Sequence, residues 1–374
     1  MSIDSTHEDM TMNGYANDNL ESVLGIKFVD VPDERFDKMK RKLQIVADQL
    51  DRALPKIMPP AKGVLNAKLS ANQRNILNAV LWPQYAKRHA EHMANLTSIP
   101  IQDTDEPMVD IKDVIAKRDV SFTYSTLPFH EACGNWAGKD RVMYVRQEIA
   151  HKAASVFRAL NHREVRYKPH LEDCWRPPEV QKGLYIRRVI RIARENPSWD
   201  MEQVKMHASS LTAPAPGFAG HQAGAAIDWQ LRRTGDENFL DSGNYYAEGG
   251  ACSCLDFPYL TFNQFRTRVF FLLTAHMGAF KVLSTENWHM SSGDRGMVRG
   301  EIKMATAKYG PIRSFNKQTG RTESYEAGDI DVPFLIDDQI QELVDLAGAL
   351  QIGGKSKPDY KDIVRRFFNA GVAK

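Results

Sequence analysis

Apolar side chains recur at helical spacing in the first hundred residues. Steps of three and four separate Phe36, Met39, Leu43, Val46 and Leu50. This is the pattern of an amphipathic helix, and Asp33 is placed to cap it. A second helix is predicted over residues 70–96, with an interruption near Pro83 because proline lacks the backbone N–H that a helix interior needs. Residues 26–105 are therefore predicted to form a helical N-terminal extension.

Residues 106–325 alternate between helical and extended patterns. Helices are predicted over residues 143–160, after Pro177 and Pro178, and over 261–276. Extended segments are predicted over 166–175 and 280–284. The fold class is therefore α+β, a small antiparallel sheet flanked by helices. A stripe from Ile340 to Leu350 and a second one over 359–370 predict that residues 326–374 form a C-terminal helical extension.

Composition and charge narrow the classes of function. The chain has 374 residues and a formal net charge of +2, so no strong basic excess favours nucleic acid through released counterions. Residues 1–25 carry Asp and Glu but no Lys or Arg, which predicts a flexible acidic tail and is the wrong charge for a secretory signal. The most apolar stretch, 269–283, is too short to span a bilayer. We expect a cytoplasmic protein with no nucleic-acid or membrane partner.

Three groupings of reactive side chains are more simply explained by structure. Cys252 and Cys254 are separated by one residue, too few for a zinc knuckle, so reduced thiols in a loop are predicted. His89 and His92 lie one turn apart without an HExxH pattern, which favours a solvated helix face. The helix after Pro178 is expected to present a solvated basic face rather than an anion site. That face comprises Arg187, Arg188, Arg191 and Arg194.

Two short segments carry the strongest chemical signal. His221 and Asp228 flank Gly224, and Glu286 and His289 are three positions apart. Two imidazoles and one carboxylate leave the fourth position of a tetrahedral zinc ion open for water, as in catalytic sites. Glu286 would be the base that takes a proton from that water. The alternative is that each histidine is a hydrogen-bonded core residue.

Convergence of these side chains makes two demands on the fold. A turn at Gly224 with positive φ must fold His221 back beside Asp228. Glu286 and His289 would face opposite sides of a regular strand, so a bulge, a turn or the end of the strand is needed between them. Asp228 follows Ile227, in an apolar setting where a carboxylate is rarely buried without a partner or a metal.

At these residues the chain resembles the D-alanyl-D-alanine dipeptidases, a branch of a zinc peptidase family. The family's first motif, SxHxxGxAxD, is matched by His221, Gly224, Ala226 and Asp228. Its second motif, ExWH followed by Gly-Asp, is matched by Glu286, Trp288, His289, Gly293 and Asp294. An acidic residue before aromatic-Arg-Pro is matched by Asp173, Trp175, Arg176 and Pro177. The resemblance covers about residues 110–300, the greater part of a catalytic domain over 106–325.

The resemblance implies one zinc ion per chain, bound by His221, Asp228 and His289. It implies that Glu286 is the general base and acid, and that Arg176 polarises the scissile carbonyl and stabilises the oxyanion. The implied substrate is a small dipeptide, D-alanyl-D-alanine above all. The chain departs from the family at Ala219, where a Ser is usual, and over 243–257. Both departures lie where substrate shape would be recognised, so they bear on the substrate more than on the metal.

Other interpretations of the same residues stay open. A D,D-carboxypeptidase or endopeptidase acting on peptidoglycan stem peptides would use the same chemistry. A non-haem iron oxygenase also uses two histidines and one carboxylate, although its first two ligands usually come from HxD. A non-catalytic relative would bind zinc and would not need Glu286. An ion pair with Asp173 or Glu172 is the structural alternative for Arg176.

Overall fold

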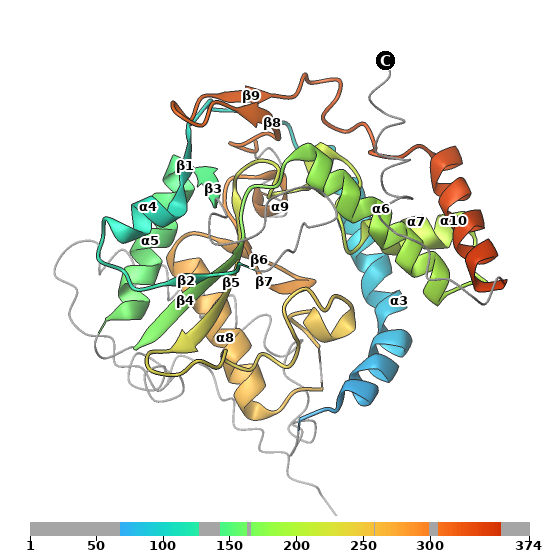
Figure 1. The fold of residues 1–374 in the computed structure, drawn as a ribbon, viewed down its shortest axis with the longest axis horizontal. Coiled ribbons are helices and arrows are strands. Elements are labelled where there is room, and N and C mark those ends of the chain that lie inside the picture. The colour runs from blue at the N-terminus through green and yellow to red at the C-terminus, as the bar shows by residue number, and fades with distance from the viewer. Residues whose placement is uncertain (1–67, 127–142, 163–165, 258, 299–305, 353–374) are drawn as a thin grey trace, which may run out of the picture.

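A computed structural model describes residues 68–126, 143–162, 166–257, 259–298 and 306–352. The predicted acidic tail, the helix from Asp33 and the helix over 359–370 lie outside these residues. Within the described part, the fold is mixed α+β with eight α-helices and a five-stranded sheet (Figure 1). None of the helices in this part is long and apolar enough to cross a membrane.

The five-stranded sheet has one parallel edge. Its spatial order is β2 (Thr123–Tyr124), β4 (Tyr167–Asp173), β5 (Ala226–Arg233), β7 (Glu286–Ser291) and β6 (Lys281–Leu283). The pairs from β4 to β6 are antiparallel, but β2 runs parallel to β4, so the prediction of an antiparallel sheet is wrong at this edge. The chain between β2 and β4 includes helix α5 (Gln147–Asn161), and a helical crossover allows neighbouring strands to run parallel.

One face of the sheet is buried against α5 and α8 (Phe262–Met277), which lie beside it in Figure 1. The ring of Trp229 on β5 lies 5.4 Å from Phe157 of α5 and 4.9 Å from Phe271 of α8, centroid to centroid. Because side chains alternate along a strand, Asp228 and Gln230 point to the opposite face. The two helices thus supply the hydrophobic core and leave the other face for polar side chains.

The predicted helix over 143–160 begins later than expected. Its first residues form strand β3 (Tyr144–Arg146), which pairs with β1 (Met108–Asp110), and α5 starts only at Gln147. The buried guanidinium of Arg146 forms an ion pair of 2.7 Å with Asp103 and donates to the carbonyl oxygen of Glu106 at 2.8 Å. These long-range contacts hold the segment extended against its local helical pattern.

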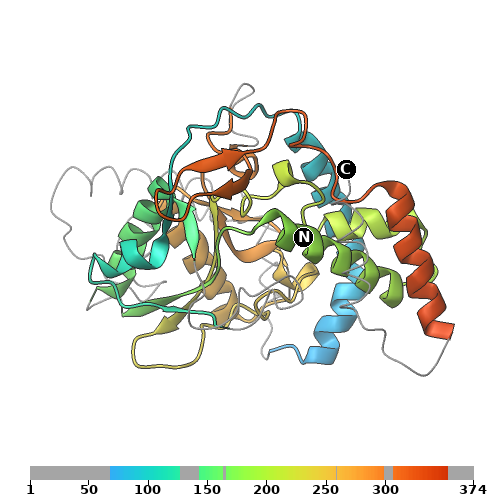
Figure 2. The same ribbon diagram turned by 45° about the horizontal axis from the view of Figure 1, so that its top comes forward.

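Helices α6 (Pro178–Glu195), α7 (Met201–Ser209) and α10 (Asp337–Ile352) form a second helical group, with α10 at the outer edge in Figures 1 and 2. Pro178 begins α6, as predicted, since proline suits the first turn of a helix. The buried side chains Ile340, Leu343 and Ala347 of α10 pack in a core shared with α6 and α7. The stripe predicted for this helix is confirmed as far as Ala347, and the side chain of Leu350 lies outside the described part.

Helix α3 (Ala71–Leu96) packs against α7 and the turn at residues 251–253. Ser70 caps its first turn, and the helix continues through Pro83, so the predicted interruption is wrong. Pro83 is exposed, whereas Trp82 and Ala86 are buried against the segment that contains Cys252 and Cys254. Packing on both sides of Pro83 maintains a helix that sequence preference alone would break.

The remaining elements are short. They are α4 (Ile111–Ala116), α9 (Arg295–Val298), the hairpin β8 (Ile312–Phe315) and β9 (Thr322–Ser324), and the 3-10 turns η3 (Pro216–Phe218) and η4 (Ala251–Ser253). Cys252 and Cys254 are buried and form no disulfide, which confirms the prediction of reduced thiols, while Cys133 lies outside the described residues.

Candidate metal centre

His221 lies in a tight turn that precedes β5. The backbone N–H of Gly224 donates to the carbonyl oxygen of His221 at 3.2 Å, and that of Ala225 donates to Gly220 at 3.1 Å. Gly224 has φ +66°, as the sequence demanded, and this conformation favours glycine. The turn brings Nε2 of His221 to 3.1 Å from Oδ1 of Asp228.

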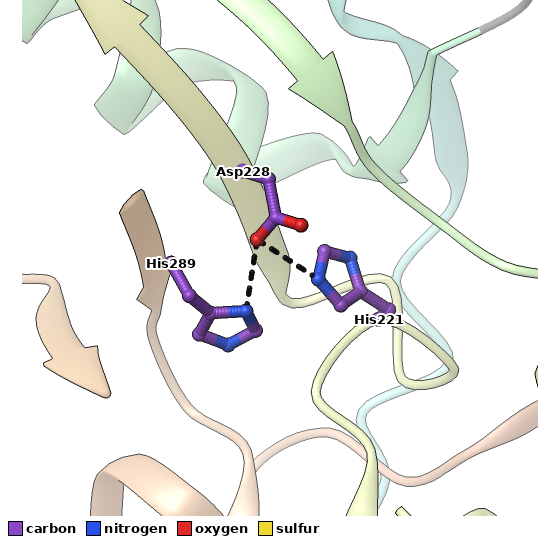
Figure 3. A group of neighbouring side chains, drawn as sticks. All are labelled: His221, Asp228 and His289. Carbon is purple, nitrogen blue, oxygen red and sulfur yellow. Dashed lines mark hydrogen bonds and ion pairs between the residues drawn. The ribbon is translucent and has the colours of Figure 1, made fainter. Parts of the chain in front are cut away.

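Asp228 and His289 are direct neighbours across two strands. In the antiparallel pair β5–β7, Asp228 is in register with His289, so both side chains leave the sheet on the same face. Nδ1 of His289 lies 3.0 Å from Oδ1 of Asp228. The two imidazole rings are 4.7 Å apart, and Figure 3 shows both of them turned toward one oxygen of the carboxylate. The structure therefore brings the three predicted ligands together.

Glu286 reaches the same group from the start of β7. The pairing of β6 with β7 is irregular between Val282 and Leu283, and Glu286 is the first residue of its strand. This is the irregularity at a strand end that the three-residue spacing required. Oε2 of Glu286 lies 3.8 Å from Nδ1 of His289, and both side chains line the same cavity.

A β-bulge places Arg176 on the other side of Asp228. The register of β4 against β5 shifts between Leu171 and Asp173, which turns Asp173 to the face that carries Asp228. Nε of Arg176 donates to Oδ2 of Asp173 at 2.6 Å, and Nη2 donates to Oδ2 of Asp228 at 3.2 Å. Arg176 therefore makes the ion pair with Asp173 that the structural alternative expected and also contacts the candidate metal centre.

Tyr246 is a site residue whose role sequence reasoning missed. Its hydroxyl donates to Oδ2 of Asp228 at 3.1 Å, and its ring packs edge-on against Trp288 at 5.6 Å. Tyr246 belongs to residues 241–250, which we call the strap. Arg268 of α8 holds the strap by donating to the carbonyl oxygen of Ser242 at 2.7 Å. Tyr246 lies in the segment 243–257, which departs from the family that the chain resembles. Apart from its position shortly after the first motif, nothing in the sequence indicated its role.

The electrostatics of the group are set by burial and by mutual contact. Burial disfavours the charged form of Asp228, but the imidazoles of His221 and His289 hold its pKa below the ordinary value. Burial and the charge of Arg176 lower the pKa of His221. Burial raises the pKa of Glu286, only partly offset by the charge of His289. Asp228 is thus ionised, while Glu286 is shifted toward its protonated form.

The hydrogen bonds of His221 leave a position that suits a cation. Nδ1 of His221 lies 2.6 Å from the carbonyl oxygen of Cys174, which can only accept, so Nδ1 carries the proton. In a neutral ring, Nε2 then carries a lone pair that faces the lone pairs of Asp228 Oδ1. These lone pairs repel one another unless a cation lies between the two atoms. Ligands at about 2.0–2.1 Å from a tetrahedral zinc ion lie roughly 3.3 Å apart, close to the 3.1 Å and 3.0 Å found here. The buried group of His221, Asp228 and His289 could hold a metal ion.

The candidate centre opens into a cavity of about 510 Å³ between the sheet, α3, the start of α6 and the segment after α7. His89 and His92 of α3 line this cavity, and His89 is buried. The prediction of a solvated helix face is therefore wrong at His89, whereas His92 is half-buried. That face of α3 borders the cavity, whereas Glu91 on the other side of the helix is exposed.

No protein-family model matches the chain, and no curated protein matches it either. Within the described part of the chain, His221, Asp228 and His289 are the only group with the spacing of metal ligands. A metalloenzyme is consistent with this arrangement.

Proposed function

We propose that the protein is a metal-dependent peptidase that hydrolyses the bond before a C-terminal D-alanine, with D-alanyl-D-alanine as the simplest substrate and zinc as the metal. The observation that carries the proposal is the convergence of His221 and His289 on one oxygen of Asp228, with Glu286 beside it. The resemblance of the motifs to D-alanyl-D-alanine dipeptidases supplies the bond type.

Nε2 of His221, Oδ1 of Asp228 and Nδ1 of His289 would hold the ion. Two nitrogen donors and one oxygen donor suit zinc. Bound there, the ion would supply Lewis acidity, which polarises a carbonyl oxygen and acidifies a water molecule. The carbonyl oxygen of Cys174 keeps the proton of His221 on Nδ1, and this second contact orients the ring for its role as a ligand.

Glu286 is the residue placed to move a proton. Its carboxylate lines the cavity 3.8 Å from the His289 ring, within reach of a water molecule beside the three ligands. Oε2 would accept a proton from the attacking water and return it to the leaving amine. Burial raises the pKa of Glu286, which favours this exchange close to neutral pH.

Arg176 is the residue placed to stabilise the oxyanion. It lines the cavity, and Asp173 orients its guanidinium through a contact of 2.6 Å. A charge held rigidly at this position stabilises the negative oxygen that develops when the scissile carbonyl is attacked. Tyr246 and Arg176 also fix Oδ2 of Asp228, which leaves Oδ1 for the ion.

The size of the cavity favours a second candidate, a carboxypeptidase acting on a longer peptide that ends in D-alanyl-D-alanine, such as a peptidoglycan stem peptide. Cavities of about 300–1,000 Å³ typically bind drug-sized molecules. The cavity here has about 510 Å³, more than a dipeptide of two alanines requires. The hydrolytic residues would be the same.

The test is hydrolysis by the zinc-loaded full chain of D,D-, L,D- and L,L-dialanine and of a pentapeptide ending in D-alanyl-D-alanine. We expect cleavage only where a D-alanine follows the scissile bond. Activity on the pentapeptide alone would select the carboxypeptidase. If the zinc-loaded protein hydrolyses none of these four peptides, the proposal is overturned. If the protein instead binds iron and carries out an oxygen-dependent reaction, the oxygenase is favoured.

Glu286→Gln separates catalysis from metal binding. The variant keeps the three ligands, so we expect it to retain zinc while hydrolysis falls by about 10²–10⁴-fold, the usual contribution of general acid–base catalysis. Glu237→Gln, at a side chain that is 96% exposed, is the matched control and should behave as the wild type. Equal hydrolysis by the two variants would exclude Glu286 as the general base, whereas zinc binding without hydrolysis in the wild type would favour a non-catalytic zinc-binding protein.

A further inference from the structure

A second cavity, of about 470 Å³, lies between α3, α6, α7 and the end of the strap. Asn78 and Trp82 of α3 line it on one side, and Arg188 of α6 lines it on the other. Leu211, which follows α7, lines both this cavity and the one at the candidate metal centre. The two cavities are therefore neighbours along the groove between α3 and α6.

Arg188 brings to this second cavity a positive charge that no described residue neutralises by direct contact, although the carboxylates of Glu286 and Glu195 act on it from beyond ion-pair distance. The other charged groups there are already paired: Arg191 with Glu195 at 2.8 Å, and Glu248 with Arg74 at 3.1 Å. Among the residues that the structure describes, none forms a hydrogen bond or an ion pair with Arg188.

The surroundings of Arg188 disfavour leaving that charge without a counterion. The side chain is half-buried, and burial lowers the pKa of Arg188 to about 10, so the guanidinium remains charged at neutral pH. A charged group removed from water is stabilised by a partner of opposite charge. The backbone of Gly249 runs against the guanidinium, where a Cβ would lie 3.7 Å from Nη1. The predicted solvated basic face is therefore wrong at Arg188.

The position of Arg188 relative to Arg176 sets the length of a ligand that contacts both. Nη1 of Arg176 donates to Gln181 at 3.3 Å, so Gln181 marks the metal end of α6. Gln181 and Arg188 lie about two helical turns apart, which corresponds to about 10 Å. An extended peptide rises about 3.3 Å per residue, so roughly three residues span this distance. A dipeptide is shorter than this span.

We propose that the second cavity is a subsite for a carboxylate of the substrate, bound by Arg188, and that the substrate is an acidic peptide longer than a dipeptide. This inference rests on the proposed peptidase function. Removal of a C-terminal D-alanine leaves the rest of the peptide on the acyl side of the scissile bond, so the carboxylate belongs to that side. A guanidinium presents a planar pair of N–H donors that matches a carboxylate.

The test uses two N-acetylated pentapeptides that end in D-alanyl-D-alanine and carry Glu or Gln at the second residue. The wild type should cleave the Glu peptide with a kcat/KM at least about tenfold higher, because a charged hydrogen bond is replaced by a neutral one. Arg188→Gln should lose this preference, and Arg188→Lys, which keeps the charge, should retain part of it. Arg158→Gln, an exposed arginine on α5, is the matched control and should keep the full preference.

Calorimetric titration of the same proteins with both peptides separates the subsite from catalysis. Tighter binding of the Glu peptide that depends on Arg188 supports the subsite even if neither peptide is cleaved, in which case only the peptidase function fails. Equal affinity and equal kcat/KM for the Glu and Gln peptides in the wild type would overturn the subsite. A preference that persists in Arg188→Gln would overturn the role of Arg188.

Discussion

The two faces of the central sheet bury neighbouring residues equally but surround them differently. Asp228 and Trp229 are adjacent on β5, and each is only 1% exposed. Trp229 lies among apolar rings of α5 and α8, whereas the carboxylate of Asp228 contacts His221, His289, Arg176 and Tyr246. Burial alone therefore does not separate a structural residue from a candidate functional one. The difference is that the second face supplies a partner for each oxygen of the carboxylate.

Asp228→Asn should produce the largest effect. The amide has no negative charge to hold a cation between two imidazoles, so we predict loss of zinc and a fall in hydrolysis greater than the roughly 10²–10³-fold cost of one oxyanion contact. Metal content after dialysis and the rate of hydrolysis measure this. Asp236→Asn, on the exposed loop after β5, is the control. Full zinc occupancy in Asp228→Asn would contradict the assignment of Asp228 as a ligand.

Trp229→Ala should act on the other face. Removing a buried ring typically costs about 3–5 kcal/mol of folding free energy, because the rings of Phe157 and Phe271 would border the space it leaves. Denaturant unfolding measures the loss, and the activity per folded molecule should stay close to that of the wild type. A loss of less than about 1 kcal/mol would mean that this face is not the main core.

Tyr246→Phe should have a smaller effect, confined to the polar face. The variant keeps the ring against Trp288 and removes only the hydroxyl that donates to Asp228. Loss of such a supporting contact typically lowers metal affinity about 10–100-fold, which competition with a chelator measures. Tyr245→Phe is the matched control, because the neighbouring Tyr245 is 69% exposed. Identical zinc affinity in the two variants would remove Tyr246 from the site.

Glu148→Gln should have the smallest effect, because the carboxylate of Glu148 lies on neither face of the central sheet. Lys152 and Lys308 lower the pKa of Glu148 to about 2, so its ion pairs stabilise the fold above the ordinary pKa of 4.5 and are lost as the pH falls toward 2. The side chain is 40% exposed, and solvent screening limits the contribution to below about 1 kcal/mol. The melting temperatures of wild type and variant should differ slightly at pH 6 and converge as the pH falls toward 2. A constant difference would contradict this account.

Local features of the sequence predicted the parts of the site that depend on local geometry. Gly224 signalled the turn that returns His221 to Asp228, and the spacing of Glu286 and His289 demanded an irregular strand. The helices α5 and α8 were also predicted, although α5 begins at Gln147 and not at 143. These predictions succeeded because each depends on a few consecutive residues with restricted backbone conformations.

Where a feature depends on pairing between distant segments, the sequence-based prediction either missed it or was wrong. The bulge that turns Asp173 toward Asp228, and the burial of His89, depend on strands and helices far apart in the chain. Strand β3 and the continuous helix around Pro83 run against local preference, and both are held by contacts with remote segments. Periodicity within a window does not contain this information.

Sequence alone identified which side chains could bind a cation, since that choice depends on the chemistry of imidazoles and carboxylates at a recognisable spacing. Only the tertiary structure decided that Tyr246 and Arg176 share the second oxygen of Asp228, and that Arg188 borders a cavity beside the centre. These contacts arise where separate layers of the fold meet, and the free energy that brings the layers together comes from burying apolar surface elsewhere in the molecule.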